Sequence, residues 1–419
     1  DNFVQIGHGG DENDGDATGS VALLSSGLVT LNGSNSGSDG YVQIGLGGHD
    51  ATGNLGTVGD LVTVIGQGID LNGGTSLRSS VQVGSGGFNA DGNLTASVFV
   101  NVNPLTALPA GGGAITLDAG SGNDAFVQIG TGGSGQDGSK NGNTIVQGDS
   151  VRVQAGSGGA AYAHIGAGSG IHSDTVDRGS GTINTNTTVT ATSGGVTVSA
   201  AGAGAHSYAQ IGGGGLIADG ALSGNNSLST LVNASGDVVL TGGSNSNNFA
   251  MIGLGGGGAD GTKSMAGTSV TGATVTLTGG SGPGTFAQIG SGGGSTGGNK
   301  AANGVVSAAD TTVTTTVGDL VLNSGAGANS YALVGVGGAN LIGALSGNTL
   351  ANVAGAMTLN SAGGGAGSFS QIGLGGFNAD GVHTGSTTAT AGGAIVLTGG
   401  AANDTYAQIG AGGAGSDGN

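Results

Sequence analysis

The sequence contains no cysteine, only 3 prolines, and only 7% charged residues. Without cysteine the chain has no disulfide framework, no thiol nucleophile and no cysteine metal site. A collagen triple helix is excluded, because it needs glycine at every third position and abundant proline. No run of about 18 apolar residues occurs, so we expect no membrane span.

Basic residues are also scarce, since 6 Lys and Arg stand against 24 acidic residues and give a net charge of −18. Nucleic acids and anionic membrane surfaces attract basic patches, so neither is an expected partner. The same balance permits divalent cations. Nearly all of the acid is aspartate, a turn former, and we expect most of it at loop corners.

Glycine is abundant, with 102 of the 419 residues. Glycine disfavours helix by about 1 kcal/mol per position relative to alanine. Disordered chains are usually highly charged and poor in β-branched residues, whereas this chain is rich in Val, Ile and Thr. The composition therefore predicts a β-rich and turn-rich protein.

One motif, aromatic–small–Gln–Ile–Gly–x–Gly–Gly, recurs along the whole chain. Its eleven Ile or Val anchors stand 36 to 46 residues apart at Ile6, Ile44, Val83, Ile129, Ile165, Ile211, Ile252, Ile289, Val334, Ile372 and Ile409. A fixed motif with variable spacing is typical of solenoids, in which each repeat contacts only its neighbours and absorbs insertions in a loop.

Two further columns accompany these anchors. The aromatic column holds Phe3, Tyr41, Phe126, Tyr162, Tyr208, Phe249, Phe286, Tyr331, Phe369 and Tyr406, with Ser80 as the exception. The glutamine column holds Gln5, Gln43, Gln82, Gln128, Gln210, Gln288, Gln371 and Gln408, with His164, Met251 and Leu333 at the other places. Stacked at the inter-strand spacing of roughly 4.8 Å, they predict a ring ladder and an amide ladder.

A second strand ends 11 or 12 residues before the glutamine column, as in 273–277, and a weaker third strand precedes it, as in 187–191 and 312–316. The pattern predicts an all-β, right-handed parallel β-solenoid of ten to eleven repeats with three strands each. One large coil per repeat is expected, with two smaller coils as the alternative. We interpret residues 1–419 as a single continuous array and expect it to be a segment of a longer chain.

The aromatic and Gln positions alternate with the small and Ile positions, so the two sets point to opposite faces of the strand. Both sets are restricted in composition, which predicts that both faces are buried. One face would line the solenoid core. The other would be covered by glycine-rich loops or by a neighbouring molecule.

An Asp-Gly pair follows the Ile column by eight residues at Asp14, Asp91, Asp137, Asp219, Asp260, Asp380 and Asp417. The pair is typical of a turn, and the alternative is calcium bound along an aspartate ladder. Calcium is therefore the one cofactor we consider. The candidate ligands are Asp11, Asp14 and Asp16 in the densest acidic patch, and Asp137, Asp260 and Asp417 at corners that match Gly-Gly-x-Gly-x-Asp.

Catalysis finds little support in the sequence. The six histidines lack metal-ligand spacing such as His-x-x-x-His, and the six basic residues form no recurring column. We therefore expect no enzyme.

Gly-Asp pairs open apolar strands at Gly59-Asp60, Gly148-Asp149, Gly236-Asp237 and Gly318-Asp319. In these features the whole chain resembles the repeats of filamentous-haemagglutinin-like exoproteins and related giant adhesins. The present repeats are about twice as long as is usual there, and the N-terminal secretion domain of that family is not seen. The resemblance implies secretion and a role in adhesion or in a matrix, and it assigns no binding residue.

Uniform repetition without a unique site favours an extracellular, cell-surface filament or stalk, adhesin-like, whose partner is a second copy of itself, packed head to tail or laterally. The alternative is a binding module that recognises glycan, including cell-surface glycans, ice or mineral through one face. That alternative predicts outward residues that recur in every coil.

Overall fold

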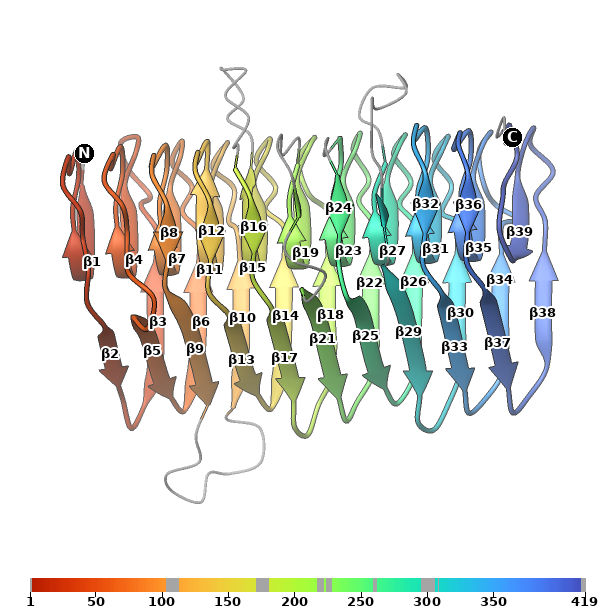
Figure 1. Cartoon of the computed structure of the whole chain (residues 1–419), viewed down its shortest axis with the longest axis horizontal. Coiled ribbons are helices and arrows are strands. Elements are labelled where there is room, and N and C mark those ends of the chain that lie inside the picture. Colours follow the sequence, from red (N-terminus) through yellow and green to blue (C-terminus); the bar gives the residue numbers. More distant parts are fainter. Residues whose placement is uncertain are drawn as a thin grey trace.

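The computed structural model describes residues 2–102, 113–170, 181–216, 222–223, 228–258, 262–294, 306–307 and 309–415. Within these residues the regular elements are all β-strands, and the paired strands are parallel. The strands lie across the long axis of a rod, and successive coils stack along that axis (Figure 1). The predicted all-β parallel solenoid is confirmed.

Three long sheets form the sides of the rod. The first sheet contains β1 (Phe3–Gly9), β4 (Tyr41–Gly47), β7 (Ser80–Gly86), β11 (Phe126–Ser134), β15 (Tyr162–Gly170), β19 (Tyr208–Gly214), β23 (Phe249–Gly255), β27 (Phe286–Gly292), β31 (Tyr331–Gly337), β35 (Phe369–Gly375) and β39 (Tyr406–Ile409). The second sheet contains β2 (Val21–Leu24), β5 (Leu61–Gly66), β9 (Ser97–Val102), β13 (Thr144–Gly148), β17 (Thr187–Ala191), β21 (Ser229–Ala234), β25 (Gly267–Gly272), β29 (Asp310–Thr315), β33 (Thr349–Val353) and β37 (Thr387–Ala391).

The third sheet contains β3 (Leu28–Asn32), β6 (Gly68–Asn72), β10 (Ala114–Asp118), β14 (Ser150–Gln154), β18 (Val196–Ser199), β22 (Val238–Thr241), β26 (Val275–Thr278), β30 (Leu320–Asn323), β34 (Met357–Asn360) and β38 (Ile395–Thr398). Two-residue minor strands lie between the first and second sheets: β8 (Leu94–Thr95), β12 (Lys140–Asn141), β16 (Ile183–Asn184), β20 (Leu222–Ser223), β24 (Lys263–Ser264), β28 (Val306–Ser307), β32 (Leu345–Ser346) and β36 (His383–Thr384).

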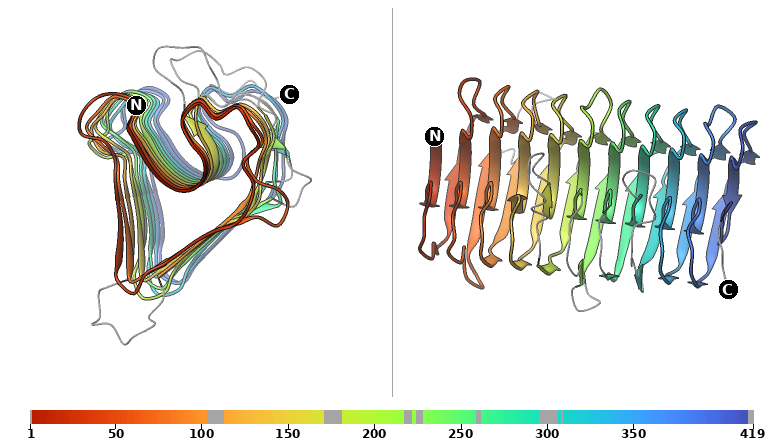
Figure 2. Two further views of the ribbon diagram at one scale, coloured as in Figure 1. Left: turned by 90° about the vertical axis from the view of Figure 1, so that its left-hand side faces the viewer. Right: turned by 90° about the horizontal axis from the view of Figure 1, so that it is seen from above.

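Each coil runs from the first sheet to the second, then to the third, and back to the first. Seen from the N-terminal end, the chain turns clockwise as it recedes, which is the predicted right-handed sense (Figure 2). The register joins equivalent residues of successive repeats, such as Ile6 with Ile44 and Leu31 with Leu71. Each repeat is therefore one coil, and the alternative of two smaller coils is wrong.

The first sheet is bent into a trough, which the sequence analysis did not predict (Figure 2). The bend falls at glycines after the Ile column. Gly253, for example, has φ +137°, and a Cβ there would lie 1.9 Å from the carbonyl oxygen of Gly290 in the next coil. Only glycine tolerates both this φ and this approach, so the Gly-x-Gly-Gly part of the motif encodes the bend.

Residues on both faces of the first sheet are buried, as predicted. The main core lies inside the rod and takes the Ile/Val columns together with inward residues of the second and third sheets, such as Val64 and Leu71. The opposite face carries a separate aromatic cluster, covered by Phe88, Leu216 and Phe377 from the chain that follows the strands. We expected this face to be covered either by glycine-rich loops or by a neighbouring molecule, and the loops of the chain itself cover it.

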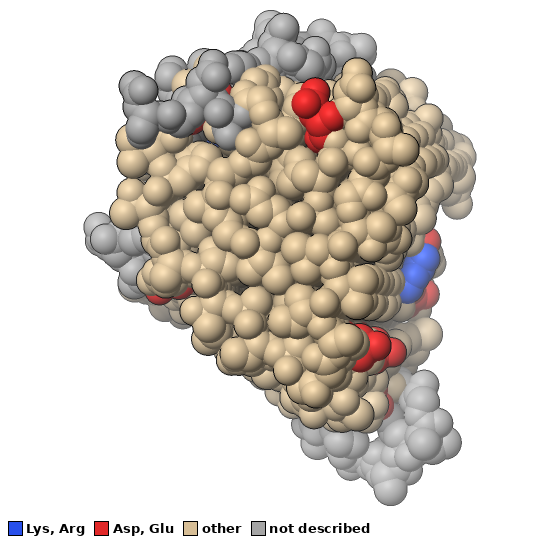
Figure 3. All heavy atoms as spheres, turned by 90° about the vertical axis from the view of Figure 1, so that its right-hand side faces the viewer, with Lys and Arg blue, Asp and Glu red and all other residues tan. Residues whose placement is uncertain are grey.

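Each interior coil depends on the next one for its burial. Met357 and Leu359 of β34 are fully buried, whereas Ile395 and Leu397, their partners in β38, are 47% and 44% exposed. Figure 3 shows this C-terminal end of the rod, where charged side chains sit at the rim and uncharged residues fill the rest.

Candidate functional surfaces

The aromatic column forms the predicted ring ladder. From Phe126 to Tyr406, successive rings have centroids 4.7 to 5.2 Å apart and planes within 5° of parallel. Tyr162, Tyr208 and Tyr331 are almost completely buried, and burial raises their side-chain pKa values well above the usual range. The ladder is thus an interior support and does not present a binding surface.

The glutamine column is buried as expected, but its bonding differs from a simple amide ladder. Amide-to-amide contacts appear at Gln5 to Gln43, 3.3 Å, and Gln43 to Gln82, 3.4 Å. Elsewhere the Nε2 group bonds to carbonyls at the glycine bends, as Gln288 does to Ser291 and Gly337, both at 3.1 Å. The amide thus adds a hydrogen bond at the bend, where the Gly337 carbonyl also accepts the backbone N–H of Gly293 at 3.0 Å.

His164 replaces glutamine in this column and performs the same task. Its Nε2 lies 3.0 Å from the carbonyl oxygen of Gly212. Complete burial lowers the pKa of His164 to about 4, with the Gly212 contact opposing that shift, so the ring is neutral near neutral pH. As a neutral ring it donates one hydrogen bond to the bend, in place of the glutamine amide.

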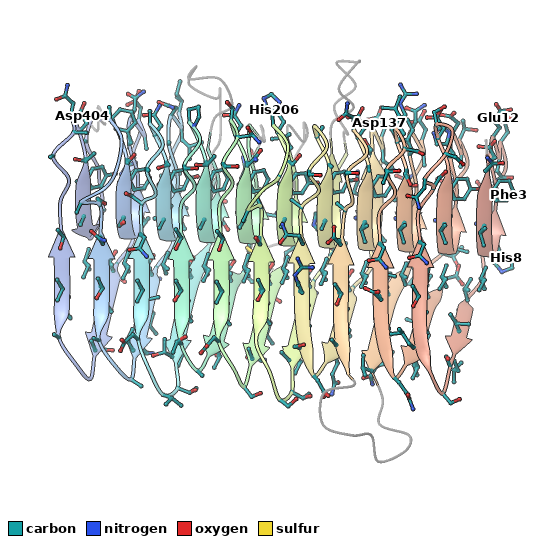
Figure 4. The ribbon with its side chains drawn as sticks, turned by 180° about the vertical axis from the view of Figure 1, so that it is seen from behind. Phe3, His8, Glu12, Asp137, His206 and Asp404 are labelled. Carbon is teal, nitrogen blue, oxygen red and sulfur yellow. The ribbon has the colours of Figure 1, made fainter. Side chains whose placement is uncertain are left out.

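The corners of the coils hold much of the acid, as predicted. Glu12, Asp39, Asp50, Asp124 and Asp404 all adopt positive φ values of 51° to 61°. Short polar side chains favour this left-handed conformation because they bond locally to the backbone. In Figure 4 the labelled Glu12, Asp137, His206 and Asp404 lie on the same side of the rod, at the corners after and before the strands of the first sheet.

At three of the four described Asp-Gly pairs that follow the Ile column, the glycine has the positive φ that the turn interpretation predicts, whereas Gly15 after Asp14 does not. The glycines after Asp91, Asp137 and Asp380 have φ values of +116°, +95° and +121°. Such values need glycine, which explains the pair without any bound ion.

The predicted calcium ligands of the first coil have separate partners. Asp14 accepts a hydrogen bond from Thr52 Oγ1 at 3.1 Å, and Asp16 accepts one from the N–H of Asn54 at 2.9 Å. Asp11 faces His49 instead, with 3.9 Å between Oδ1 and Nδ1. The described part of the chain holds no group of three His, Asp or Glu side chains able to bind a metal ion.

Asp260 and Asp417 lie outside the described residues. Asp137 is half-buried, and a lysine is already present beside it. Lys140 Nζ donates to the carbonyls of Gln136 and Gly138 at 3.3 and 3.2 Å. Burial lowers the pKa of Lys140 to about 8, and the Asp137 carboxylate opposes that shift. This corner therefore carries an internal ammonium group.

Buried lysines are features that the sequence analysis missed. Lys140 and Lys263 are 2% and 1% exposed, and both stand eleven residues after their Ile anchors, in minor strands. The expectation that basic residues share no column was wrong for this pair. The available signal was a repeated sequence, Asp-Gly-Ser/Thr-Lys, which ends at both positions.

A polar cluster near the N-terminal end was also missed. His49 is 6% exposed and stacks on Phe88 with ring centroids 4.8 Å apart. Its Nδ1 lies 3.0 Å from Asp50 Oδ2, and its Nε2 lies 3.7 Å from Asp39 Oδ1. These contacts join two corners of one coil across the mouth of the trough. The signal was the equivalent position of His49 and Phe88, each five residues after its anchor.

The outer face of the second sheet presents a middle row of mostly β-branched or apolar side chains. The row runs Ala22, Thr63, Phe99, Ile145, Thr188, Leu231, Ser269, Thr312, Leu350 and Thr388. The row beside it is mostly short and polar: Leu24, Ile65, Asn101, Gln147, Thr190, Asn233, Thr271, Thr314, Asn352 and Thr390. Neither row contains a charged residue.

A hollow interrupts this face at three neighbouring strands. It has a volume of about 310 Å³ and is formed by β21, β25 and β29 around Gly267. Ser229, Leu231, Ser269, Asp310 and Thr312 supply the outward side chains at its border. At this hollow a carboxylate, several hydroxyl groups and an apolar side chain meet around a recess.

Comparison with protein-family models, with curated proteins and with solved structures finds no match to this chain. The resemblance to filamentous-haemagglutinin-like exoproteins thus stays a prediction. Among the residues described, no helix has the length and apolar character needed to cross a membrane.

Proposed function

We propose that this chain is a rigid, non-catalytic rod in an extracellular filament, stalk or adhesin of a cell surface or matrix. The observation that carries the proposal is the repetition of one cross-section in every coil, held by the same buried columns. A rod of this kind transmits force and sets a distance without needing a unique site. Its structural parts are the ring ladder, the glutamine column and the glycine bends.

Self-association is the expected partner interaction, either head to tail or side by side. Each coil covers the core of its neighbour, so a coil from a second copy, or a further coil of the same chain, has the same complementary surface to offer. The low basic content disfavours nucleic acid and anionic membranes as partners. Calcium at the acidic corners stays a prediction, testable by a calcium-dependent rise in melting temperature.

The test of the rod role is structural and mechanical. Electron microscopy of the isolated chain should show a rod with an axial rise of roughly 4.8 Å per coil, and filaments should keep this spacing through every junction. Compact particles without an axial repeat would contradict the proposal.

A surface-binding module is the second candidate, favoured by the two uncharged rows on the second sheet. It differs from the rod role in its dependence on side chains. Substitutions in the outward rows would abolish binding to glycans, ice or mineral and leave the length of the rod unchanged. If the rod shows no saturable binding to any such surface, the mechanical role is the one candidate function that remains.

A further inference from the structure

We infer that the outer face of the second sheet carries a binding site for a neutral saccharide, centred on Gly267. The site is additional to the rod role, and it rests on the surface-binding alternative by naming its ligand class and place. The rod can exist without this site. An experiment that excludes saccharide binding therefore leaves the proposed rod role untouched, and an experiment that excludes the rod role is a different one.

The site is a grid of two columns over three neighbouring strands. Ser229, Gly267 and Asp310 are in register in one column, and Leu231, Ser269 and Thr312 are in register in the other. Ser229 and Asp310 stand two strand spacings apart, or about 9.6 Å. Gly267 between them has no side chain, so its backbone is the floor of the hollow.

Glycine at this position is not required by the backbone dihedral, and the close approach of a Cβ is milder than at the bends. The bend glycines have strongly positive φ values and would place a Cβ about 2 Å from a carbonyl, as at Gly253. Gly267 has an ordinary strand φ, and its Cβ would meet one carbonyl oxygen, that of Asp310, at 2.9 Å, so a side chain there needs a small shift of the backbone. Glycine weakens a strand, and within one it often marks a bend or close approach by another backbone or a ligand.

Most equivalent positions in other coils carry polar side chains that bond to the next coil, with Leu61 as an exception. Asn186 Oδ1 accepts the N–H of Ser229 at 2.8 Å, and Asn348 Oδ1 accepts the N–H of Ser386 at 3.0 Å. Gly267 interrupts this column of polar side chains. The interruption creates the recess and exposes its polar border.

The border suits a polyol. Asp310 Oδ1 accepts the N–H of Asn348 at 2.7 Å, which fixes the carboxylate and leaves Oδ2 for a ligand hydroxyl. Ser269 and Thr312 add hydroxyl groups that can donate or accept. Leu231 supplies the apolar contact that the C–H face of a sugar ring needs. A few placed polar groups beside apolar surface are the usual composition of a ligand site.

The volume limits the ligand. At about 310 Å³ the hollow is at the lower end of ligand pockets, roughly 300–1,000 Å³. It would hold one or two sugar rings of a longer glycan. Ice or a mineral would need an even lattice, which the recess at Gly267 breaks, and a mineral would need more charge than Asp310 offers.

The experiment is calorimetric titration of the whole chain with four separate probes: cellotetraose, chitotetraose, maltotetraose and mannotetraose. We expect saturable binding of at least one, with a Kd on the order of millimolar. Gly267→Asn fills the recess with the residue found at equivalent positions and should weaken binding at least about tenfold. Asp310→Asn should also weaken it, because a carboxylate is the stronger acceptor.

Ser97→Asn is the matched control, since Ser97 begins β9 as Gly267 begins β25, several coils away. It should bind the probe as the unaltered chain does. All variants should keep the length of the rod, and Gly267→Asn should lower the melting temperature only slightly, which separates loss of the site from loss of the rod. No binding of any tetrasaccharide, or equal binding by Gly267→Asn, would overturn the inference. Inhibition of ice growth without saccharide binding would overturn it as well.

Discussion

His164 makes one coil sensitive to acid. Its folded pKa of about 4 lies below the ordinary value of 6.5, so the unfolded chain binds the proton first as pH falls. Stability is therefore lost as pH falls from about 6.5 toward 4, by on the order of 3 kcal/mol. His164→Gln, which restores the common residue of the column, should remove this loss.

Melting temperatures at pH 7 and pH 4.5 check the prediction. His206→Asn serves as the control, because His206 lies at an exposed corner where the next coil has Asn247. The control should keep the acid sensitivity of the unaltered chain. An unchanged pH response in His164→Gln would show that another group governs it.

Rings in the ladder and rings on the surface should differ in their contribution to stability. Phe249 is fully buried between Tyr208 and Phe286, with centroids 4.8 Å from each. Phe249→Ala should lower the free energy of unfolding by about 3–5 kcal/mol. Phe99→Ala, on the outer face of β9, should cost about 1 kcal/mol or less. Urea unfolding of both variants measures the difference, and equal effects would contradict the ladder's importance.

At this scale, the sequence was informative where a residue type recurs in every coil. Phe249 could be assigned from the aromatic column alone. A similar residue recurs at the positions of His49 and Lys140 in only a few coils, and their burial depends on how the trough folds back over the first sheet. The periodicity of the sequence identifies the columns. The burial of a single polar residue can be assigned only once the three-dimensional path of the chain is known.

At the scale of elements, the bend of the first sheet depends on glycine. Gly253→Ala would place a methyl group 1.9 Å from the carbonyl oxygen of Gly290, at a φ of +137°. The unfavourable dihedral alone should cost about 1–3 kcal/mol, and the clash adds to this cost. The hydrogen bonds between β23 and β27 should therefore open more often. Hydrogen exchange in these two strands should rise sharply.

Gly267→Ala provides the comparison for that prediction. Gly267 has an ordinary strand φ and a nearest contact of 2.9 Å, against 1.9 Å at Gly253, so we expect a much smaller rise in hydrogen exchange. Similar exchange in the two variants would mean that the bend does not need glycine.

The three main strands of each coil could be predicted. The alternating segment around Val313 forms a strand of the second sheet, and the one around Leu277 forms a strand of the third. The minor strands could not, because two residues carry no periodicity. The trough was missed for a related reason. Glycines in a glycine-rich chain do not reveal which of them adopt positive φ.

At the scale of the whole molecule, coils should be interchangeable. Phe249 and Phe286 are in register, so deletion of residues 250–286 joins two equivalent points. The deletion should preserve the fold and shorten the rod by roughly 4.8 Å. Small-angle scattering and electron microscopy measure the length. Deleting about half of this segment breaks the register and should abolish folding, and survival of that variant would contradict the one-coil repeat.

The ring ladder also has an optical consequence. The chain has no tryptophan and 5 tyrosines, and all of them, Tyr41, Tyr162, Tyr208, Tyr331 and Tyr406, stand in the ladder. Tyrosine absorbance, fluorescence and near-ultraviolet dichroism therefore come from this one column. Because burial raises the tyrosine pKa values, phenolate absorbance in alkali would appear only as the stack opens, and the protein carries its own built-in reporter of unfolding.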